Sequence, residues 1–398
     1  MKWNNKSHEF DLVHERIRNS LILEKGVYCF GAGKIGSKFH NMIKSLCNII
    51  GYIDNDKEKI GGFHDGKKVY SLDEILYDNP YIVITVMPDK YSDIRYQLSS
   101  YGLIDEKNYT YWEQFLKNIF PIALNYQMGK NYVDMTQISV TERCTLSCIN
   151  CAHACNYVSI NDNDLPLDVV KKSADSFFSV CDYVNTFVLI GGEPLLYKDL
   201  ASVIDYIGEN YRERIYKIQI TTNGTIIPTE EIIEKCIKWN VFFLISNYSS
   251  QIPKLELQYS KLTNLLKTSG IEFALFPKET EWTDYGFESV ERDDNPIELI
   301  KVFDACHTEC HEVRGEKFYF CVMARSVNEN MNRGVGINDY LDLSKLNPKS
   351  EEDKRIFMEY SLGFSINGYL EMCKYCNGAE RVFYKIPAAV QGKKKDKW

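Results

Sequence analysis

The chain has 398 residues and a formal net charge of −8, with 44% hydrophobic and 26% charged residues. This composition excludes wholesale disorder, and the length predicts two or three domains of about 150 residues each. No apolar run approaches the roughly 18 residues of a membrane-spanning helix, so we expect no membrane partner. The N-terminal sequence lacks the apolar core of a signal peptide, which favours a cytoplasmic protein. The acidic balance disfavours a nucleic-acid partner, because a phosphate-binding surface needs clustered Lys and Arg.

The 13 cysteines favour metal or redox chemistry, because the number is odd and disulfides are rare in the cytoplasm. Four cysteines stand alone in apolar or helical stretches, where buried structural thiols are expected: Cys29, Cys47, Cys181 and Cys236. The other nine form two groups along the chain: Cys144, Cys148, Cys151 and Cys155, and then Cys306, Cys310, Cys321, Cys373 and Cys376. Two groups of this kind predict two inorganic sites.

Strands and helices alternate in the first third of the chain. Strands are predicted at Gly26–Phe30, Ile49–Ile53 and Tyr81–Val86, and a helix at Tyr91–Tyr101. This alternation predicts a Rossmann-like domain with a parallel sheet over residues 1–112. Residues 113–133 are predicted to form a linker that contains a helix.

A glycine-rich loop follows the first predicted strand. Its pattern is Gly31-x-Gly33-x-x-Gly36, it opens a helix, and Asp54 follows at the end of the second strand. This setting is typical of a nucleotide site, where glycines admit a phosphate and the carboxylate binds a ribose hydroxyl. The stretch also resembles Rossmann-like modules of bacterial sugar-modifying enzymes, which implies a handle for a nucleotide-linked substrate. A vestigial or protein-docking module is the alternative.

The alternation resumes over residues 134–290, with strands predicted at Gln137–Val140, Thr186–Leu189, Ile218–Thr222 and Val241–Ile245. The first of these strands is followed by cysteines with the spacing C-x3-C-x2-C. Three thiolates on one loop can bind three irons of a [4Fe–4S] cluster and leave the fourth iron open for a ligand. This pattern resembles the radical S-adenosylmethionine (SAM) superfamily, which implies Cys144, Cys148 and Cys151 as ligands and a partial (β/α)6 barrel.

Three later motifs agree with this resemblance in their order. They end successive strands, where parallel α/β barrels place their active sites. The resemblance implies that these residues bind SAM: Gly191, Gly192, Glu193, Pro194, Thr222, Asn223, Ser246 and Asn247. Asn150 departs from the family, which commonly has an aromatic residue there, so adenine contact is expected from Ile149 or from a residue after the cluster loop. Cys155 is a rival to Cys144 as a cluster ligand.

The last group of cysteines predicts a second cluster in a small, irregular domain over residues 291–398. Cys306, Cys321, Cys373 and Cys376 form two pairs that can close a cage of four thiolates, and Cys310 is a possible substitute for Cys306. The spacing resembles the twitch form of the SPASM domain, which implies an auxiliary [4Fe–4S] cluster. Zinc is the alternative, because it also accepts four thiolates.

The whole chain resembles uncharacterised radical SAM proteins associated with bacterial surface-polysaccharide genes. Trp282-Thr-Asp-Tyr-Gly and Ile386-Pro-Ala-Ala-Val-Gln contribute to this resemblance. It implies reductive cleavage of SAM to a 5′-deoxyadenosyl radical, hydrogen abstraction from a small molecule, and an electron donor such as flavodoxin or ferredoxin. The favoured substrate is a nucleotide-linked sugar that is oxidised or epimerised, with Cys155 and Tyr248 as candidate catalytic residues. Peptide maturation and a non-catalytic scaffold or sensor are the alternatives.

Overall fold

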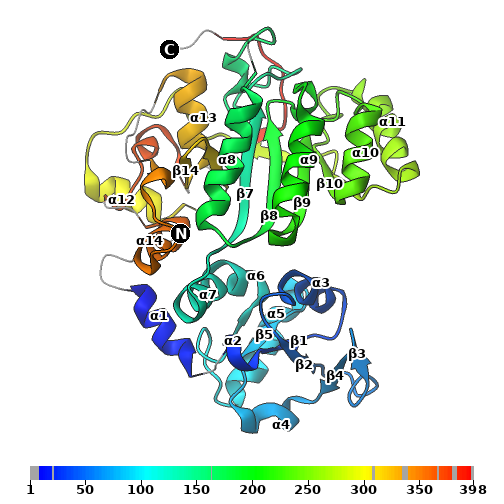
Figure 1. Ribbon diagram of the computed structural model, residues 1–398, viewed down its shortest axis with the longest axis vertical. Helices are drawn as coiled ribbons and strands as arrows, with labels where there is room; N and C mark the ends of the chain where they lie inside the picture. Colours follow the sequence, from blue (N-terminus) through cyan, green and yellow to red (C-terminus); the bar gives the residue numbers. More distant parts are fainter. Residues whose placement is uncertain are drawn as a thin grey trace. The chain divides into compact units, whose positions relative to one another are not determined.

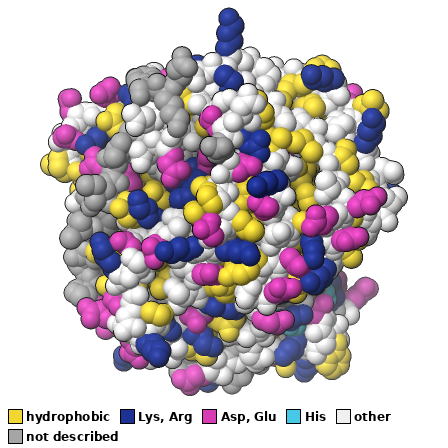
Figure 2. Space-filling view, turned by 45° about the horizontal axis from the view of Figure 1, so that its top comes forward, with side chains coloured by type: hydrophobic (Ala, Val, Ile, Leu, Met, Phe, Trp, Pro, Cys, Tyr) yellow, Lys and Arg dark blue, Asp and Glu magenta, His cyan; other side chains and the backbone are white. Residues whose placement is uncertain are grey.

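The computed structural model describes residues 9–19, 22–162, 164–306, 310–333, 339–364, 367–378 and 383–395. The chain forms two compact units, which divide between Asp134 and Met135. No helix within the described ranges is long and apolar enough to cross a bilayer. On the face shown in Figure 2, acidic and basic side chains are interspersed rather than gathered by sign.

The N-terminal unit contains the predicted parallel sheet. Its strand order is β3-β4-β2-β1-β5-β6, and only the β3–β4 pair is antiparallel. The strands are Val27–Phe30 (β1), Ile49–Ile53 (β2), Phe63–His64 (β3), Lys67–Tyr70 (β4), Ile82–Ile84 (β5) and Tyr109–Tyr111 (β6). The three predicted strands are therefore confirmed.

Helices connect these strands. They are Glu9–Arg18 (α1), Ile22–Lys25 (α2), Lys34–Ile43 (α3), Leu72–Ile75 (α4), Pro88–Ser100 (α5), Trp112–Gln114 (α6) and Phe120–Met128 (α7). The helix α5 begins three residues earlier than predicted, because Pro88 occupies its first turn, where a missing N–H costs no hydrogen bond.

The segment 113–133, predicted as a linker, packs within the N-terminal unit. A π-helical turn, Phe115–Ile119, joins α6 to α7, and the side chains of Phe115 and Phe120 are buried against each other with ring centroids 5.6 Å apart. Apolar side chains of this size need a core, which explains why the segment folds back instead of extending as a tether.

The second unit is built on a larger sheet of order β11-β10-β9-β8-β7-β13-β14-β15. Helices α8 and α9 lie over one face of strands β7 to β9 (Figure 1). The strands are Tyr132–Thr141 (β7), Tyr183–Gly191 (β8), Ile215–Thr222 (β9), Val241–Ile245 (β10), Phe273–Leu275 (β11), His311–Arg314 (β13), Lys317–Tyr319 (β14) and Tyr340–Asp342 (β15). The helices are Leu167–Val180 (α8), Leu200–Tyr211 (α9), Glu230–Trp239 (α10), Leu255–Thr268 (α11), Pro296–Asp304 (α12), Val322–Met331 (α13) and Glu351–Ser361 (α14).

Strands β8 to β11 are parallel neighbours in chain order, as expected for a partial barrel. The C-terminal region differs from the predicted separate domain, because three of its strands extend this sheet. Strand β13 pairs in parallel with β7, with His311 opposite Thr136, and β14 and β15 follow as antiparallel strands. Residues 134–290 and 291–398 therefore share one compact unit.

A two-stranded ladder joins two further segments. Strand β12 (Glu281–Thr283) pairs antiparallel with β16 (Lys385–Pro387), with Trp282 opposite Ile386. The two motifs noted in the sequence, which are separated by about 100 residues, thus form one structural element.

Candidate active site

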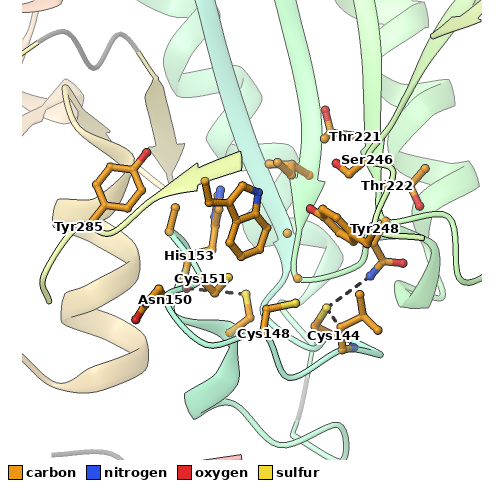
Figure 3. A pocket seen from close by; sticks show the side chains of 18 of the residues that line it. Cys144, Cys148, Asn150, Cys151, His153, Thr221, Thr222, Ser246, Tyr248 and Tyr285 are labelled. Carbon is orange, nitrogen blue, oxygen red and sulfur yellow. Dashed lines mark hydrogen bonds between the residues drawn. The ribbon is translucent and has the colours of Figure 1, made fainter. Parts of the chain in front are cut away.

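The first cysteine group lines one cavity at the end of β7. Cys144, Cys148, Cys151 and Cys155 all line this cavity, which has a volume of about 370 Å³. Figure 3 shows Cys144, Cys148 and Cys151 along a single loop beneath the same space. The donor set fits a [4Fe–4S] cluster with an open iron, because three of these thiols can bind three irons and leave the fourth iron free for another ligand.

The start of this loop is fixed by a partly buried ion pair. Arg143, the residue before Cys144, binds Asp164 through two parallel contacts, Nε–Oδ1 at 2.7 Å and Nη2–Oδ2 at 2.6 Å. The Asp164 carboxylate also accepts a hydrogen bond from the Thr141 hydroxyl at 2.7 Å. A two-pronged Arg–carboxylate pair of this kind is directional, so it sets the direction in which the chain leaves β7.

Helix α13 holds the residues that follow Cys151. The Ser326 hydroxyl donates to the Ala152 carbonyl at 3.2 Å, and the Asn330 amide donates to the His153 carbonyl at 2.8 Å. His153 lines the cavity, and its Nδ1 is buried without a hydrogen-bond partner among the described residues. Helix α13 thus holds the main chain of a residue in the cavity wall.

Two thiols of the group are in contact with each other. A hydrogen bond with the Cys155 thiol lowers the pKa of Cys151 to about 6. Burial raises the pKa of Cys144 and of Cys148 to about 12. If Cys144, Cys148 and Cys151 hold the cluster, Cys155 remains as a thiol beside it.

The backbone conformation of Asn150 accounts for the lack of an aromatic residue at this position. Its φ angle is +56°, a left-handed conformation that asparagine tolerates better than aromatic residues do. Asn150 lines the cavity, whereas Ile149, expected at the adenine, does not line it. Aromatic rings come from elsewhere instead: Tyr248, Trp282 and Tyr285 line the cavity, and the first two rings lie 5.6 Å apart.

The two glycines at the end of β8 allow close contact between main chains. A Cβ on Gly191 would lie 2.1 Å from the Thr141 carbonyl oxygen, and one on Gly192 would lie 2.2 Å from that of Arg143. Both glycines line the cavity, and a side chain at either position would clash with the main chain at the end of β7 or directly after it.

Glu193 is fully buried and is not one of the residues that line the cavity. Its carboxylate accepts hydrogen bonds from the Thr222 hydroxyl at 2.8 Å, the Asn223 N–H at 2.8 Å and the Leu195 N–H at 3.1 Å. Burial raises its pKa to about 7. In this geometry Glu193 braces the ends of β8 and β9.

The other predicted SAM residues divide in the same way. Thr222, Asn223 and Ser246 line the cavity, whereas Pro194 and Asn247 do not, and the catalytic candidate Tyr248 lines it as well. The Asn247 side chain instead accepts hydrogen bonds from the Ser249 N–H at 3.1 Å and hydroxyl at 2.8 Å. The predicted residues that do line the cavity come from the ends of β8, β9 and β10 (Figure 3).

The cavity residues without a role assigned from the sequence include four from one distant segment: Glu281, Trp282, Thr283 and Tyr285. They belong to β12 and the turn after it, which β16 holds in place. The sequence signal for these residues is the motif Trp282-Thr-Asp-Tyr-Gly, which contributes to the family resemblance but indicates no role. Its place at the cavity depends on a partner strand about 100 residues away, which local pattern does not reveal.

The second cysteine group is assembled from three segments. Cys306 follows α12, Cys321 precedes α13, and Cys373 and Cys376 lie in and after a short 3-10 helix, Glu371–Tyr375. Burial raises the pKa of Cys321, and the nearby thiols of Cys306 and Cys376 raise it further. The thiols of Cys306 and Cys376 therefore lie near that of Cys321.

Backbone contacts support this arrangement. The Arg292 guanidinium donates to the carbonyl oxygens of Cys373 and Cys376, so one side chain ties the last pair together. The Cys310 carbonyl accepts the Val322 N–H at 3.0 Å, which places Cys310 next to Cys321 as well.

The N-terminal glycine loop has the geometry of a tight strand-to-helix turn. Gly31 has φ +123°, and a Cβ on Gly36 would lie 2.3 Å from the Gly31 carbonyl oxygen, whereas Gly33 faces open space. The Asp54 carboxylate accepts the Ala32 N–H at 3.0 Å and contacts the Lys59 ammonium at 2.9 Å. Asp54 is therefore already engaged by protein donors that a ribose would have to replace.

Residues 138–246 match the model of the radical SAM superfamily, and residues 23–108 match that of the C2185-like N-terminal family. A probable GTP 3′,8-cyclase of Methanocaldococcus jannaschii is 34% identical over 102 residues, which is 25% of this chain and 30% of that protein. The GTP 3′,8-cyclase of Clostridium acetobutylicum is 33% identical over 100 residues, 25% of this chain and 30% of that protein. The chain thus spans less than a third of these relatives.

The solved structures that are similar to this chain have lower sequence identities to it than these relatives. BtrN in complex with AdoMet and 2-DOIA is 17% identical with a TM-score of 0.41, covering 65% of this chain and 100% of that chain. Streptococcus suis SuiB bound to precursor peptide SuiA is 18% identical with a TM-score of 0.31, covering 41% and 37%. Residues 138–246 of the chain belong to the radical SAM superfamily, whose cofactors are SAM and a [4Fe–4S] cluster.

Proposed function

We propose that the protein uses SAM and a [4Fe–4S] cluster to abstract a hydrogen atom from a sugar or sugar-like small molecule. The observation that carries the proposal is the loop of three thiols that line a cavity of about 370 Å³. When bound, the reduced cluster would cleave SAM to methionine and a 5′-deoxyadenosyl radical. Cys144, Cys148 and Cys151 would hold the cluster, and Gly191, Gly192, Thr222, Asn223 and Ser246 would line the SAM site.

The cavity lining favours an uncharged, hydroxyl-rich substrate. Apart from the residues allotted to SAM, its polar lining consists of Asn150, His153, Thr221, Tyr248, Glu281, Thr283 and Tyr285, and none of the described lining residues is Lys or Arg. Hydroxyl and amide groups suit the hydroxyls of a sugar or cyclitol ring, and the aromatic rings suit its C–H faces. A polyphosphate in this cavity would lack a cationic partner among those residues.

We propose that Cys306, Cys321, Cys373 and Cys376 bind a second [4Fe–4S] cluster that takes part in oxidation. The alcohol would become a carbonyl after it loses a hydrogen atom to the radical, an electron to the second cluster and a proton to solvent. Epimerisation would instead need a hydrogen donor at the cavity, for which Cys155 and Tyr248 are the candidates. The glycine loop Gly31–Gly36 would hold the nucleotide of a nucleotide-linked substrate.

The test is an anaerobic assay of the reconstituted full chain. Iron and zinc are counted, and 5′-deoxyadenosine is measured with dithionite or flavodoxin as electron donor and free sugars, aminocyclitols or nucleotide sugars as substrate. We expect two clusters per chain and faster 5′-deoxyadenosine formation with one substrate class. Cys148→Ala should abolish the product, whereas Cys236→Ala, a buried cysteine of α10, should retain it. Product formation by Cys148→Ala at the wild-type rate would contradict the proposal.

A nucleotide cyclase is the second candidate, because the curated relatives are GTP 3′,8-cyclases. GTP therefore belongs in the substrate panel. If GTP accelerates 5′-deoxyadenosine formation more than any sugar, the cyclase is favoured and the sugar proposal is wrong. SAM binding without turnover by any substrate would favour a scaffold.

A further inference from the structure

The segment 389–395 runs along the loop that carries Cys148. The Ile149 N–H donates to the Val390 carbonyl at 2.9 Å, and the Gly392 N–H donates to the Ser147 carbonyl at 2.7 Å. A Cβ on Gly392 would lie 2.5 Å from the Ile149 side chain, so the two main chains approach closely. The segment is therefore a third support of the cysteine loop, besides the Arg143–Asp164 pair and helix α13.

Further contacts fix both ends of this support. The Lys394 ammonium donates to the Cys155 carbonyl at 2.8 Å, and the Lys395 ammonium lies 2.6 Å from the Glu288 carboxylate. Before the segment, the β12–β16 ladder ties Ile386 to Trp282 of the cavity wall. The segment is thus held at both ends while its middle lies against the cysteine loop.

Within the segment, Gln391 makes a direct contact with a cluster cysteine. Its Nε2 lies 3.1 Å from the Cys148 sulfur and 2.7 Å from the Ala389 carbonyl oxygen, while its Oε1 accepts the Ser147 N–H at 2.9 Å. A main-chain N–H can only donate and a carbonyl can only accept, so the orientation of the amide is determined. One amide proton therefore points at the sulfur.

We propose that Gln391 is a positioning residue that raises the reduction potential of the radical SAM cluster through its hydrogen bond to Cys148. The inference rests on the proposed function, because it requires Cys148 to be a cluster ligand. Reduction adds an electron that is shared with the ligand sulfurs, and an N–H donor stabilises the added negative charge. Cys148 is only 7% exposed, so little water competes with this donor.

Asn223 offers a comparison at the neighbouring ligand. Its amide lies 3.5 Å from the Cys144 sulfur and shares the same nitrogen with the Thr145 hydroxyl at 3.2 Å. The distance from Gln391 Nε2 to the Cys148 sulfur, 3.1 Å, is 0.4 Å shorter than the 3.5 Å from Asn223 Nδ2 to the Cys144 sulfur. We therefore expect Gln391 to have the larger influence on the cluster.

The test compares two substitutions of similar length in the full, anaerobically reconstituted chain. Gln391→Met removes the donor, and Gln391→Glu keeps an acceptor for Ser147 but places negative charge beside the sulfur. The cluster whose electron paramagnetic resonance signal changes on SAM binding is titrated against potential. At fixed ambient potential we expect an about tenfold lower ratio of reduced to oxidised clusters in Gln391→Met, equal to 59 mV for a one-electron couple, and a still lower ratio in Gln391→Glu.

The matched control is Gln251→Met, at an exposed glutamine of the same unit, which should leave the potential unchanged. An unchanged potential in Gln391→Met, in a chain whose cluster responds to SAM, would contradict this inference alone. Loss of iron in both Gln391 variants would also overturn it, because Gln391 would then act only in folding the loop. A wild-type chain with no SAM-responsive cluster would contradict the proposed function and this inference together.

Discussion

Glu193 shows how a residue of the SAM motif acts through its neighbours. Its buried carboxylate receives three hydrogen bonds from the chain itself, and two of them come from Thr222 and Asn223 at the end of β9. The side chains of these two residues line the cavity, so Glu193 fixes the wall without being part of it. Such a carboxylate is sensitive to pH, because its charge is buried.

The sign of this sensitivity follows from the direction of the pKa shift. Burial raises the pKa of Glu193 from 4.5 to about 7, so between these values the folded chain holds a proton that the unfolded chain releases. The stabilisation is complete below pH 4.5 and is lost as the pH rises through 7. We expect wild type to lose about 3 kcal/mol of unfolding free energy over this range relative to Glu193→Gln.

Anaerobic urea unfolding at pH 5, 6, 7 and 8 measures this difference. Glu231→Gln, at an exposed position on α10, is the matched control and should follow the wild-type pH dependence. Parallel pH profiles for wild type and Glu193→Gln would show that Glu193 is not protonated by its burial.

At the scale of elements, helix α13 is joined to two strands by buried charge. Arg325 is 0% exposed; its Nε lies 3.0 Å from Glu312 of β13, and its Nη1 lies 2.6 Å from Glu142 after β7. Although burial alone would raise the pKa of Glu142, Arg325 and Arg314 lower it to about 2. The same helix holds Ala152 and His153, so this network reaches the cavity wall.

Arg325→Met should destabilise the second unit by about 3–5 kcal/mol, because it removes the cation 3.0 Å from the buried Glu312 and leaves it only the more distant Arg314, at 4.0 Å, among the described residues. The double variant Arg325→Met, Glu312→Leu removes both charges and should recover a large part of that loss. Lys301→Met, at an exposed position on α12, is the control and should change little. Chemical unfolding measures all three, and equal stability of the single variant and wild type would contradict a structural role for the pair.

Local pattern was sufficient for elements that are complete within one stretch of chain. Strands β1, β2 and β5 were predicted because each is a short apolar run between turn signals, and β9 and β10 for the same reason. The three cysteines at one loop were predicted because their spacing is itself local. The pairings β7–β13 and β12–β16 were not predicted, since each joins segments more than 100 residues apart. For that reason Trp282 and Gln391 had no assigned role at the cavity.

Over the whole molecule, the chain forms two compact units, and the cysteine groups lie in only one of them. Units with separate cores generally unfold in separate steps. We expect two thermal transitions in anaerobic calorimetry, and removal of iron with a chelator should lower the midpoint of only one.

A substitution in the N-terminal unit identifies which thermal transition belongs to that unit. Gly31→Ala should lower the transition of the N-terminal unit alone, because the residue has φ +123° and its Cβ would lie 2.6 Å from the Thr85 carbonyl oxygen. A single transition that shifts both with the chelator and with this substitution would show that the two units unfold as one.

The contact between Gln391 and Cys148 spans 243 positions of the sequence. At a synthesis rate of about 5–20 residues per second, the cysteine loop leaves the ribosome roughly 10–50 seconds before its partner segment exists. During that interval the thiols lack one of their three supports, and oxygen or stray metal ions compete for them. We therefore expect the yield of correctly loaded protein to depend on oxygen and iron supply during translation, and not only on conditions after purification.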